Sequence, residues 1–239
     1  MKSNCAETLC EWRHLWRFSP LWEKTVCGAI VVLSSLRVAA YVPQSLATGN
    51  IVGGFLDPAF WGVWVAPTFI LLLWVGTVNR LPMELVRAPA STQLRANVTW
   101  LWCSAASVSC YYGMLYAVLC QVMGGKRAVV SEFWPLSLIV QTLFALVVLG
   151  LVMQLMTVLG IGWGRAVPVM LTAMVLLPWA LVGLPDIWLE LAFFFSYPMT
   201  GDTRMVLCVK GLVFVVIAMV LWMLCKAAFA RKDHVYGGS

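Results

Sequence analysis

Six long apolar runs, separated by short polar stretches, make up most of this sequence. They lie at about residues 25–42, 58–78, 98–123, 133–159, 166–184 and 205–225. An α-helix of about 20 apolar residues spans the hydrocarbon core of a bilayer, where all backbone hydrogen bonds must be satisfied internally. Each run therefore predicts one transmembrane helix. We expect an all-α polytopic membrane protein in which residues 1–239 form a single transmembrane domain.

Composition excludes a water-soluble domain. With 62% hydrophobic and 11% charged residues, the chain has too little polar surface to cover a soluble core. Most lysines and arginines fall on one side of the predicted topology, together with both termini; Arg37, Lys126, Arg127, Arg204 and Lys210 fall on the other. The positive-inside rule then predicts cytoplasmic termini and a multi-pass protein of the cell (plasma) membrane. Because the inner charges are scattered over four short segments, nucleic-acid binding is a poor explanation of the +6 net charge.

The amino-terminal tail, residues 5–23, has the pattern of an interfacial amphipathic helix. Leu9, Trp12 and Trp16 recur at helical spacing, while charged residues occupy another side. A simple hydrophobic anchor ahead of the first span is the alternative. The eight cysteines lie in this tail and in or near the apolar runs, so we expect free thiols rather than a disulfide framework.

A second short segment, residues 186–199, lies between the fifth and sixth runs on the predicted outer side. It is mostly apolar but too short to cross a bilayer, which predicts a re-entrant segment. Phe193, Phe194, Phe195 and Tyr197 are its candidate outer gate. An aromatic-rich interfacial loop explains the same residues equally well.

Polar side chains within the spans are candidates for a substrate path. Ser109, Tyr112 and Tyr116 form a stripe along the third run, and Gln141 follows Ser137 by one turn in the fourth. Membrane helices also use such groups to bond to one another, so close packing and a helix–helix hydrogen bond are the alternatives.

The sequence lacks the residues that several kinds of chemistry require. Both histidines, His14 and His234, lie in the polar tails, and no Asp or Glu lies in the middle of a predicted span. Proton-coupled and sodium-coupled carriers commonly use carboxylates buried within their spans. Hydrolysis within the membrane needs a Ser/His pair, a pair of Asp residues or a set of metal ligands. In the stretch "CQVMGGKR", Cys120 replaces the first glycine of a phosphate-loop motif and Arg127 replaces its final Ser or Thr. We therefore expect no enzyme activity, metal, cofactor or nucleotide site in this chain.

The inner loop between the second and third runs, residues 83–97, contains "ELVRAPASTQLRAN". With its six spans, its inner amino-terminal helix and its outer re-entrant segment, the chain resembles the membrane (permease) subunit of a type-2 ABC exporter of the small bacterial six-span kind. In that family this loop carries the coupling helix, which contacts the ATPase. The residues that resemble it are Glu84, Leu85, Arg87, Pro89, Ala90, Ser91, Leu94 and Arg95.

The resemblance implies a permease subunit without its own nucleotide site. ATP and Mg²⁺ would bind to separate cytoplasmic ATP-binding subunits, and a second permease, identical or homologous, would complete the assembly. The expected cargo is apolar or amphipathic: a peptide antibiotic or bacteriocin, a drug or a lipid-like molecule, as in antibiotic resistance or immunity. A positive-inside loop that binds nothing is the alternative for residues 83–97.

Two other functions remain open at the level of sequence. One is an ATP-independent six-span channel or secondary carrier. The other is a membrane scaffold or enzyme subunit, which no motif in the sequence supports. The sequence also leaves open the identity of the cargo, the direction of transport, accessory subunits, and a homodimer against a heterodimer of permeases.

Overall fold

A computed structural model describes residues 20–78, 90–124, 133–181, 184–195 and 203–236 of the chain. Within these ranges the regular structure is entirely helical, and six helical stretches are long and apolar enough to cross a membrane. The expected all-α fold is thereby confirmed for these residues, and its six long apolar helices are compatible with the expected multi-pass membrane protein. The amino-terminal segment 5–19 lies outside the described residues, and its amphipathic helix stays a prediction.

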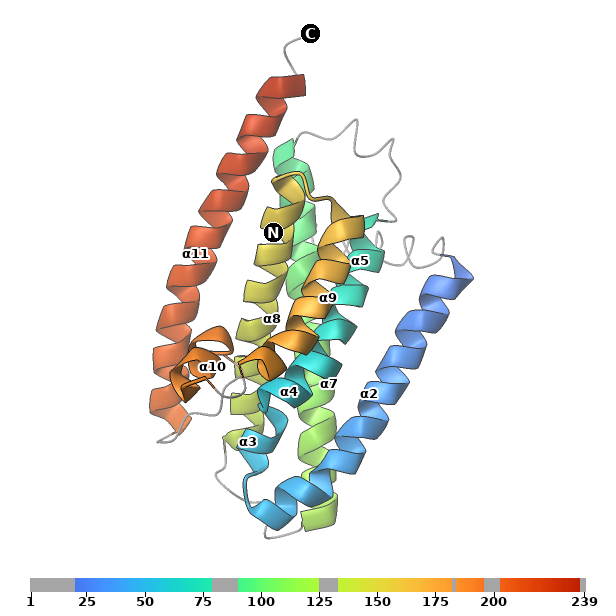
Figure 1. Cartoon of the computed structure of the whole chain (residues 1–239), viewed down its shortest axis with the longest axis vertical. Helices are drawn as coiled ribbons and strands as arrows, with labels where there is room; N and C mark the ends of the chain where they lie inside the picture. The colour runs from blue at the N-terminus through green and yellow to red at the C-terminus, as the bar shows by residue number, and fades with distance from the viewer. Residues whose placement is uncertain (1–19, 79–89, 125–132, 182–183, 196–202, 237–239) are drawn as a thin grey trace, which may run out of the picture.

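The helices alternate in direction along one common axis (Figure 1). Their bounds are α2 Leu21–Thr48, α3 Ile51–Phe55, α4 Pro58–Phe60, the π-helix η1 Trp61–Val65, α5 Ala66–Val78, α7 Ala90–Gly124, α8 Trp134–Val158, α9 Trp163–Ala180, α10 Asp186–Ala192 and α11 Thr203–Tyr236. The start of α2 and the end of α11 lie toward the same end of the bundle, which we call the terminal end. The end of α5 and the start of α7 lie there too, whereas α3 and α10 lie at the opposite, distal end.

The core is formed mainly by α5, α7 and α8. The second span and α8 are largely buried by their neighbours, whereas α2, α9 and α11 expose most of their apolar residues. Phe69 of α5, Leu101 of α7 and Leu146 of α8 are fully buried where these helices meet. In a bilayer the exposed apolar faces of the outer helices can contact lipid, so their exposure needs no partner.

The second span starts as its sequence predicts. Asp57 caps the helix, accepting a hydrogen bond of 2.8 Å from the backbone N–H of Ala59, and Pro58 occupies the first helical position. The π-helical turn that follows was not predicted. Gly62 lies in this turn against the backbone carbonyl of Met174 in α9, so the missing side chain permits a close approach of two helix backbones.

The third span differs from its predicted start. α7 is one continuous helix from Ala90 to Gly124, so residues 90–97 form its first two turns. Residues 83–89 of the expected coupling segment lie outside the described residues, so the segment as a whole stays a prediction. Composition accounts for the continuous helix, because "ASTQLRAN" contains no glycine or proline that would end a helix before the apolar run.

The described cysteines are all free thiols. Cys27, Cys120 and Cys225 are buried, and Cys103, Cys110 and Cys208 are exposed on the helix surfaces. The expectation of free thiols is confirmed for these six residues.

Candidate functional site

The predicted polar stripe on α7 faces the interior of the bundle. Ser109, Tyr112 and Tyr116 are each fully buried. Each of them meets different surroundings, and a role in a substrate path stays a prediction. Tyr116 donates a hydrogen bond of 2.7 Å to the carbonyl of Ile51, while Ser109 Oγ makes no hydrogen bond within the described residues.

Tyr112 belongs to a cluster of hydroxyls that joins three helices. Its hydroxyl lies 3.1 Å from Thr68 Oγ1 of α5, and Thr68 Oγ1 lies 3.4 Å from Ser34 Oγ of α2. The carbonyl of Trp64, in the π-helical turn, accepts hydrogen bonds from both Ser34 and Thr68. Beside this cluster, the hydroxyls of Ser35 and Tyr111 lie 2.9 Å apart. Sequence reasoning found Tyr112 but not its partners, because Ser and Thr are common packing residues in membrane helices.

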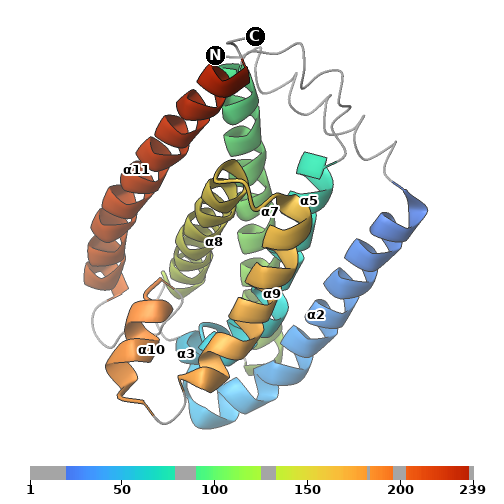
Figure 2. The ribbon, with the colours of Figure 1, turned by 45° about the horizontal axis from the view of Figure 1, so that its top comes forward.

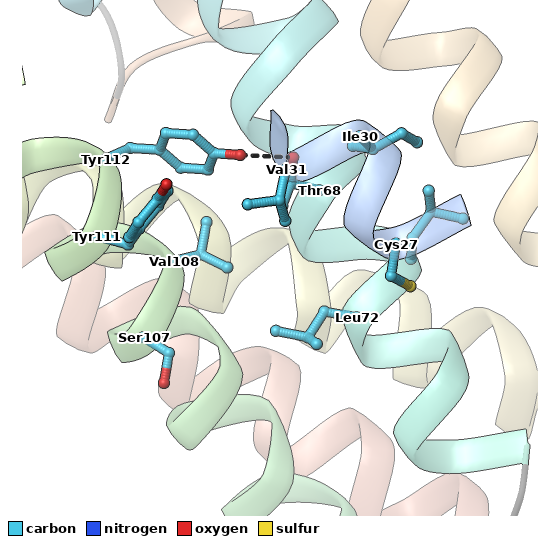
Figure 3. Close-up of a pocket in the computed structure, with 10 residues that line it drawn as sticks. Cys27, Ile30, Val31, Thr68, Leu72, Ser107, Val108, Tyr111 and Tyr112 are labelled. Carbon is cyan, nitrogen blue, oxygen red and sulfur yellow. Dashed lines mark hydrogen bonds between the residues drawn. The ribbon is translucent and has the colours of Figure 1, made fainter. Parts of the chain in front are cut away.

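A cavity of about 230 Å³ lies next to these hydroxyls, between α2, α5 and α7 (Figure 3). It is lined by Cys27, Ile30, Val31, Thr68, Leu71, Leu72, Ser107, Val108, Tyr111 and Tyr112. Figure 3 shows the Tyr112 hydroxyl directed across to Thr68 at one side of the space. Ser107 and Tyr111 are exposed, so the cavity reaches the surface of the bundle.

The lining determines what this cavity can hold. Its walls are mainly aliphatic and aromatic carbon, and none of the ten lining side chains is acidic or basic. Its volume is below the roughly 300–1,000 Å³ of a typical small-molecule pocket, so it fits one apolar chain or ring of a larger molecule. A charged group would lose its hydration there without gaining a counter-ion.

Gln141 lies away from this cavity, in α8, and links that helix to α11. Its Nε2 donates a hydrogen bond of 2.7 Å to Ser137 Oγ, and its Oε1 accepts one of 2.6 Å from Lys210 Nζ. The structure therefore gives Gln141 the helix–helix hydrogen bond that was the alternative to a path-lining role.

Lys210 is the residue that sequence reasoning missed. It was assigned to the outer side only by topology, yet its side chain is fully buried. Besides Gln141, its Nζ donates a hydrogen bond of 3.3 Å to the carbonyl of Phe195 and lies 5.9 Å from the centre of the Phe194 ring. Its position two turns inside an apolar helix was the available signal, since an ionisable residue within a span commonly marks a functional site.

The predicted gate residues Phe193, Phe194 and Phe195, which we call the aromatic segment, follow α10 at the distal end. Phe193 and Phe195 are buried and Phe194 is half-buried. Tyr197 lies outside the described residues. At seven residues α10 is too short to cross a bilayer, and a re-entrant position within the membrane stays a prediction.

The predicted ATPase-contact residues are described only in part. Glu84, Leu85, Arg87 and Pro89 lie outside the described residues, and Ser91 and Arg95 are described only as part of the α7 backbone. Leu94 is 4% exposed. Its contact with an ATPase stays a prediction, which would require this buried side chain to become exposed.

Charged groups that could bind a metal ion or carry a proton are scarce. Among the described residues, no group of three or more His, Cys, Asp or Glu side chains is placed to hold a metal ion. Glu23 lies in the first turn of α2, and Asp57 precedes α4. The polar groups deep in the described spans are therefore mainly hydroxyls, amides and the amino group of Lys210.

Comparisons with protein-family models, with curated proteins and with solved structures found no match to this chain.

Proposed function

We propose that this chain is the permease subunit of an ATP-driven exporter that moves an apolar or amphipathic molecule outward. ATP and Mg²⁺ bind to separate cytoplasmic subunits, and a second permease, identical or homologous, completes the path. The observation that carries the proposal is the position of α7. This single helix begins at the terminal end, inside the predicted ATPase-contact loop of residues 83–97, and its middle forms one wall of the cavity.

A continuous helix is a direct mechanical connection between these two places. Ala90 starts α7, Ser107 to Tyr112 border the cavity, and Tyr116 anchors the helix to Ile51 farther on. A partner that displaces the loop before Ala90 on binding ATP would tilt the whole helix, because packed helices move as rigid bodies. The tilt would change the width of the cavity between α7 and α2.

The cavity supports the class of cargo. Its uncharged lining favours an alkyl or aromatic group, and its exposed side gives a molecule dissolved in the bilayer a way in. The hydroxyls of Ser35 and Tyr111 lie near its edge, where they can accept or donate a hydrogen bond to an uncharged polar group. Peptide antibiotics, lipophilic drugs and lipid-like molecules all contain such parts.

Co-purification tests the proposal. The tagged full chain is expected to retain, in mild detergent, a protein with a phosphate-loop motif that hydrolyses ATP. Arg87→Glu reverses a charge in the predicted contact loop and is expected to release that ATPase. Arg165→Glu is the matched control, since Arg165 is exposed in the first turn of α9 at the terminal end but outside that loop.

The outcomes separate the alternatives. Loss of the ATPase with Arg87→Glu but not with Arg165→Glu supports the exporter. If no ATPase accompanies the unmodified chain, the proposal is contradicted and an ATP-independent channel or carrier takes its place. If the ATPase stays bound to Arg87→Glu, the contact has been assigned to the wrong loop.

A further inference from the structure

One amino group joins three parts of the fold at the distal end. Lys210 extends from α11, donates to Gln141 Oε1 on α8 over 2.6 Å, and donates to the Phe195 carbonyl over 3.3 Å. An amino group without hydrogen-bond acceptors is costly to bury, so these carbonyl oxygens make the buried position of Lys210 possible.

One turn away, three aromatic rings also connect α8, α11 and the aromatic segment. Phe144 follows Gln141 by three residues on α8, and Phe214 follows Lys210 by four on α11, so each lies on the same helix face as its polar neighbour. The two rings are stacked with centroids 4.3 Å apart. Phe195 packs edge-on against both, at 6.3 and 6.1 Å. We call Gln141, Phe144, Lys210 and Phe214 the socket of the aromatic segment.

The hydrogen bonds of Lys210 to Gln141 and to Phe195 connect parts that differ in how firmly they are held. α8 and α11 pack along each other more extensively than any other pair of helices, and Gln141 is itself fixed by Ser137. The segment before Phe195 is held less firmly, because α10 packs extensively against none of the described helices, and its Ile187, Trp188 and Leu191 are exposed. Figure 2 shows α10 at the edge of the bundle, beyond the end of α9. The bond to Phe195 is therefore the one that a movement of this segment would break, while Lys210 stays bound to Gln141.

We propose that Lys210 is a latch that holds the aromatic segment in the socket, and that release of the segment opens the distal mouth of the transport path. The attachment concerns this chain alone. Only the gate role rests on the proposed export function. In the closed state the latch shields the amino group of Lys210, and in the open state the Phe195 carbonyl is free to meet water or cargo.

Hydrogen–deuterium exchange on the full chain in lipid nanodiscs tests the latch. Lys210→Met removes the donor and keeps an apolar side chain of similar length, and the amides of residues 191–195 are expected to exchange about ten-fold faster. Lys226→Met is the matched control, because Lys226 is exposed on the same helix and outside the socket. It is expected to leave the exchange of the segment unchanged.

A second variant keeps the test decisive if Lys210→Met does not fold. Lys210→Met combined with Gln141→Met replaces the polar pair by two apolar side chains, a change that buried polar pairs often tolerate. In this double variant α8 and α11 are expected to keep their slow exchange while the segment loosens. Unchanged exchange of the segment would overturn the latch. An equal acceleration in α8 and α11 would overturn it too, because Lys210 would then be a general packing residue.

The gate role has its own readout. In a complex reconstituted with its ATPase, the double variant is expected to hydrolyse ATP severalfold faster without cargo, because the mouth no longer has to be opened. Unchanged hydrolysis with a loosened segment would overturn the gate and leave the latch. Absence of any associated ATPase would contradict the export proposal alone, since the exchange measurement needs no partner.

Discussion

The buried hydroxyl of Tyr116 donates a hydrogen bond of 2.7 Å to the backbone carbonyl of Ile51. The contact links α7 to the first residue of α3, between parts of the chain that are 65 residues apart. The Tyr116 ring also packs against Phe55, with centroids 5.0 Å apart. Tyr116 therefore fixes the distal end of α7, the helix that we expect to transmit movement.

Removing this hydroxyl is expected to destabilise the protein. Tyr116→Phe keeps the ring contacts but deletes the donor, for a loss of about 1 kcal/mol in the free energy of unfolding. The measurement is thermal or denaturant unfolding in one detergent. Tyr111→Phe is the control, because the Tyr111 hydroxyl bonds to Ser35 in an exposed position, and its loss is expected to matter less. Equal effects would contradict the anchoring role of Tyr116.

Gly62→Ala is expected to weaken the contact between the π-helical turn and α9. An added Cβ would collide with the carbonyl of Met174, which is backbone and cannot rotate away as a side chain would. We expect a loss of about 1–3 kcal/mol in the free energy of unfolding, the usual cost of overpacking. Gly28→Ala on α2 is the control, since a Cβ there meets open space and removes a helix-weakening glycine. A neutral Gly62→Ala would show that α9 can shift without cost.

Filling the cavity is expected to block an apolar ligand. Val31→Phe adds volume at the lining, whereas Val32→Phe adds it one residue later on an exposed face of α2. The probe is a long-chain alcohol carrying a photoreactive diazirine, in vesicles, with labelled peptides identified by mass spectrometry. Labelling of the Cys27 to Val31 region should fall severalfold in Val31→Phe only. Equal labelling in both variants would mean that the probe reports lipid contact and not the cavity.

Leu94→Glu is expected to damage folding, unlike Arg87→Glu. Leu94 is 4% exposed, so replacing it loses at least about 2 kcal/mol of apolar burial and adds the cost of burying a carboxylate. The expected result is a lower midpoint of thermal unfolding and poor recovery from detergent extraction. An unfolding midpoint equal to that of the unmodified chain would contradict a role of Leu94 in the packing of the bundle.

Length and hydropathy predicted the spans well, because a helix that crosses a bilayer must be apolar over the full thickness of the hydrocarbon core. The predicted runs 58–78 and 133–159 agree closely with the helical stretch from Pro58 to Val78 and with α8. Helix ends were less accurate: α2 continues past Pro43 to Thr48, and α11 continues to Tyr236. Beyond the hydrocarbon no apolar requirement marks where a helix ends, so the run of apolar residues underestimates its length.

The polar contacts were harder to predict, because they depend on which helices become neighbours. Helical spacing placed Tyr112 and Tyr116 on one face of α7, and both side chains are buried. It did not identify Thr68 and Ile51 as their hydrogen-bond partners. Lys210 was missed for a related reason: a lysine two turns inside a helix can reach the interface or point into the bundle, and sequence does not distinguish the two.

Helix length has a consequence at the terminal end. α7 has 35 residues and α11 has 34, so each is about 50 Å long, against about 30 Å of hydrocarbon. Even a steep tilt of about 40° leaves about 40 Å along the membrane normal, so both rods must stand out into water. The membrane-spanning part of α7 begins at Ala96 and that of α11 ends at Ala230, so each helix extends beyond its span at the terminal end. A soluble protein that approaches the membrane at the terminal end would therefore meet the ends of these two helices before it meets the lipid surface.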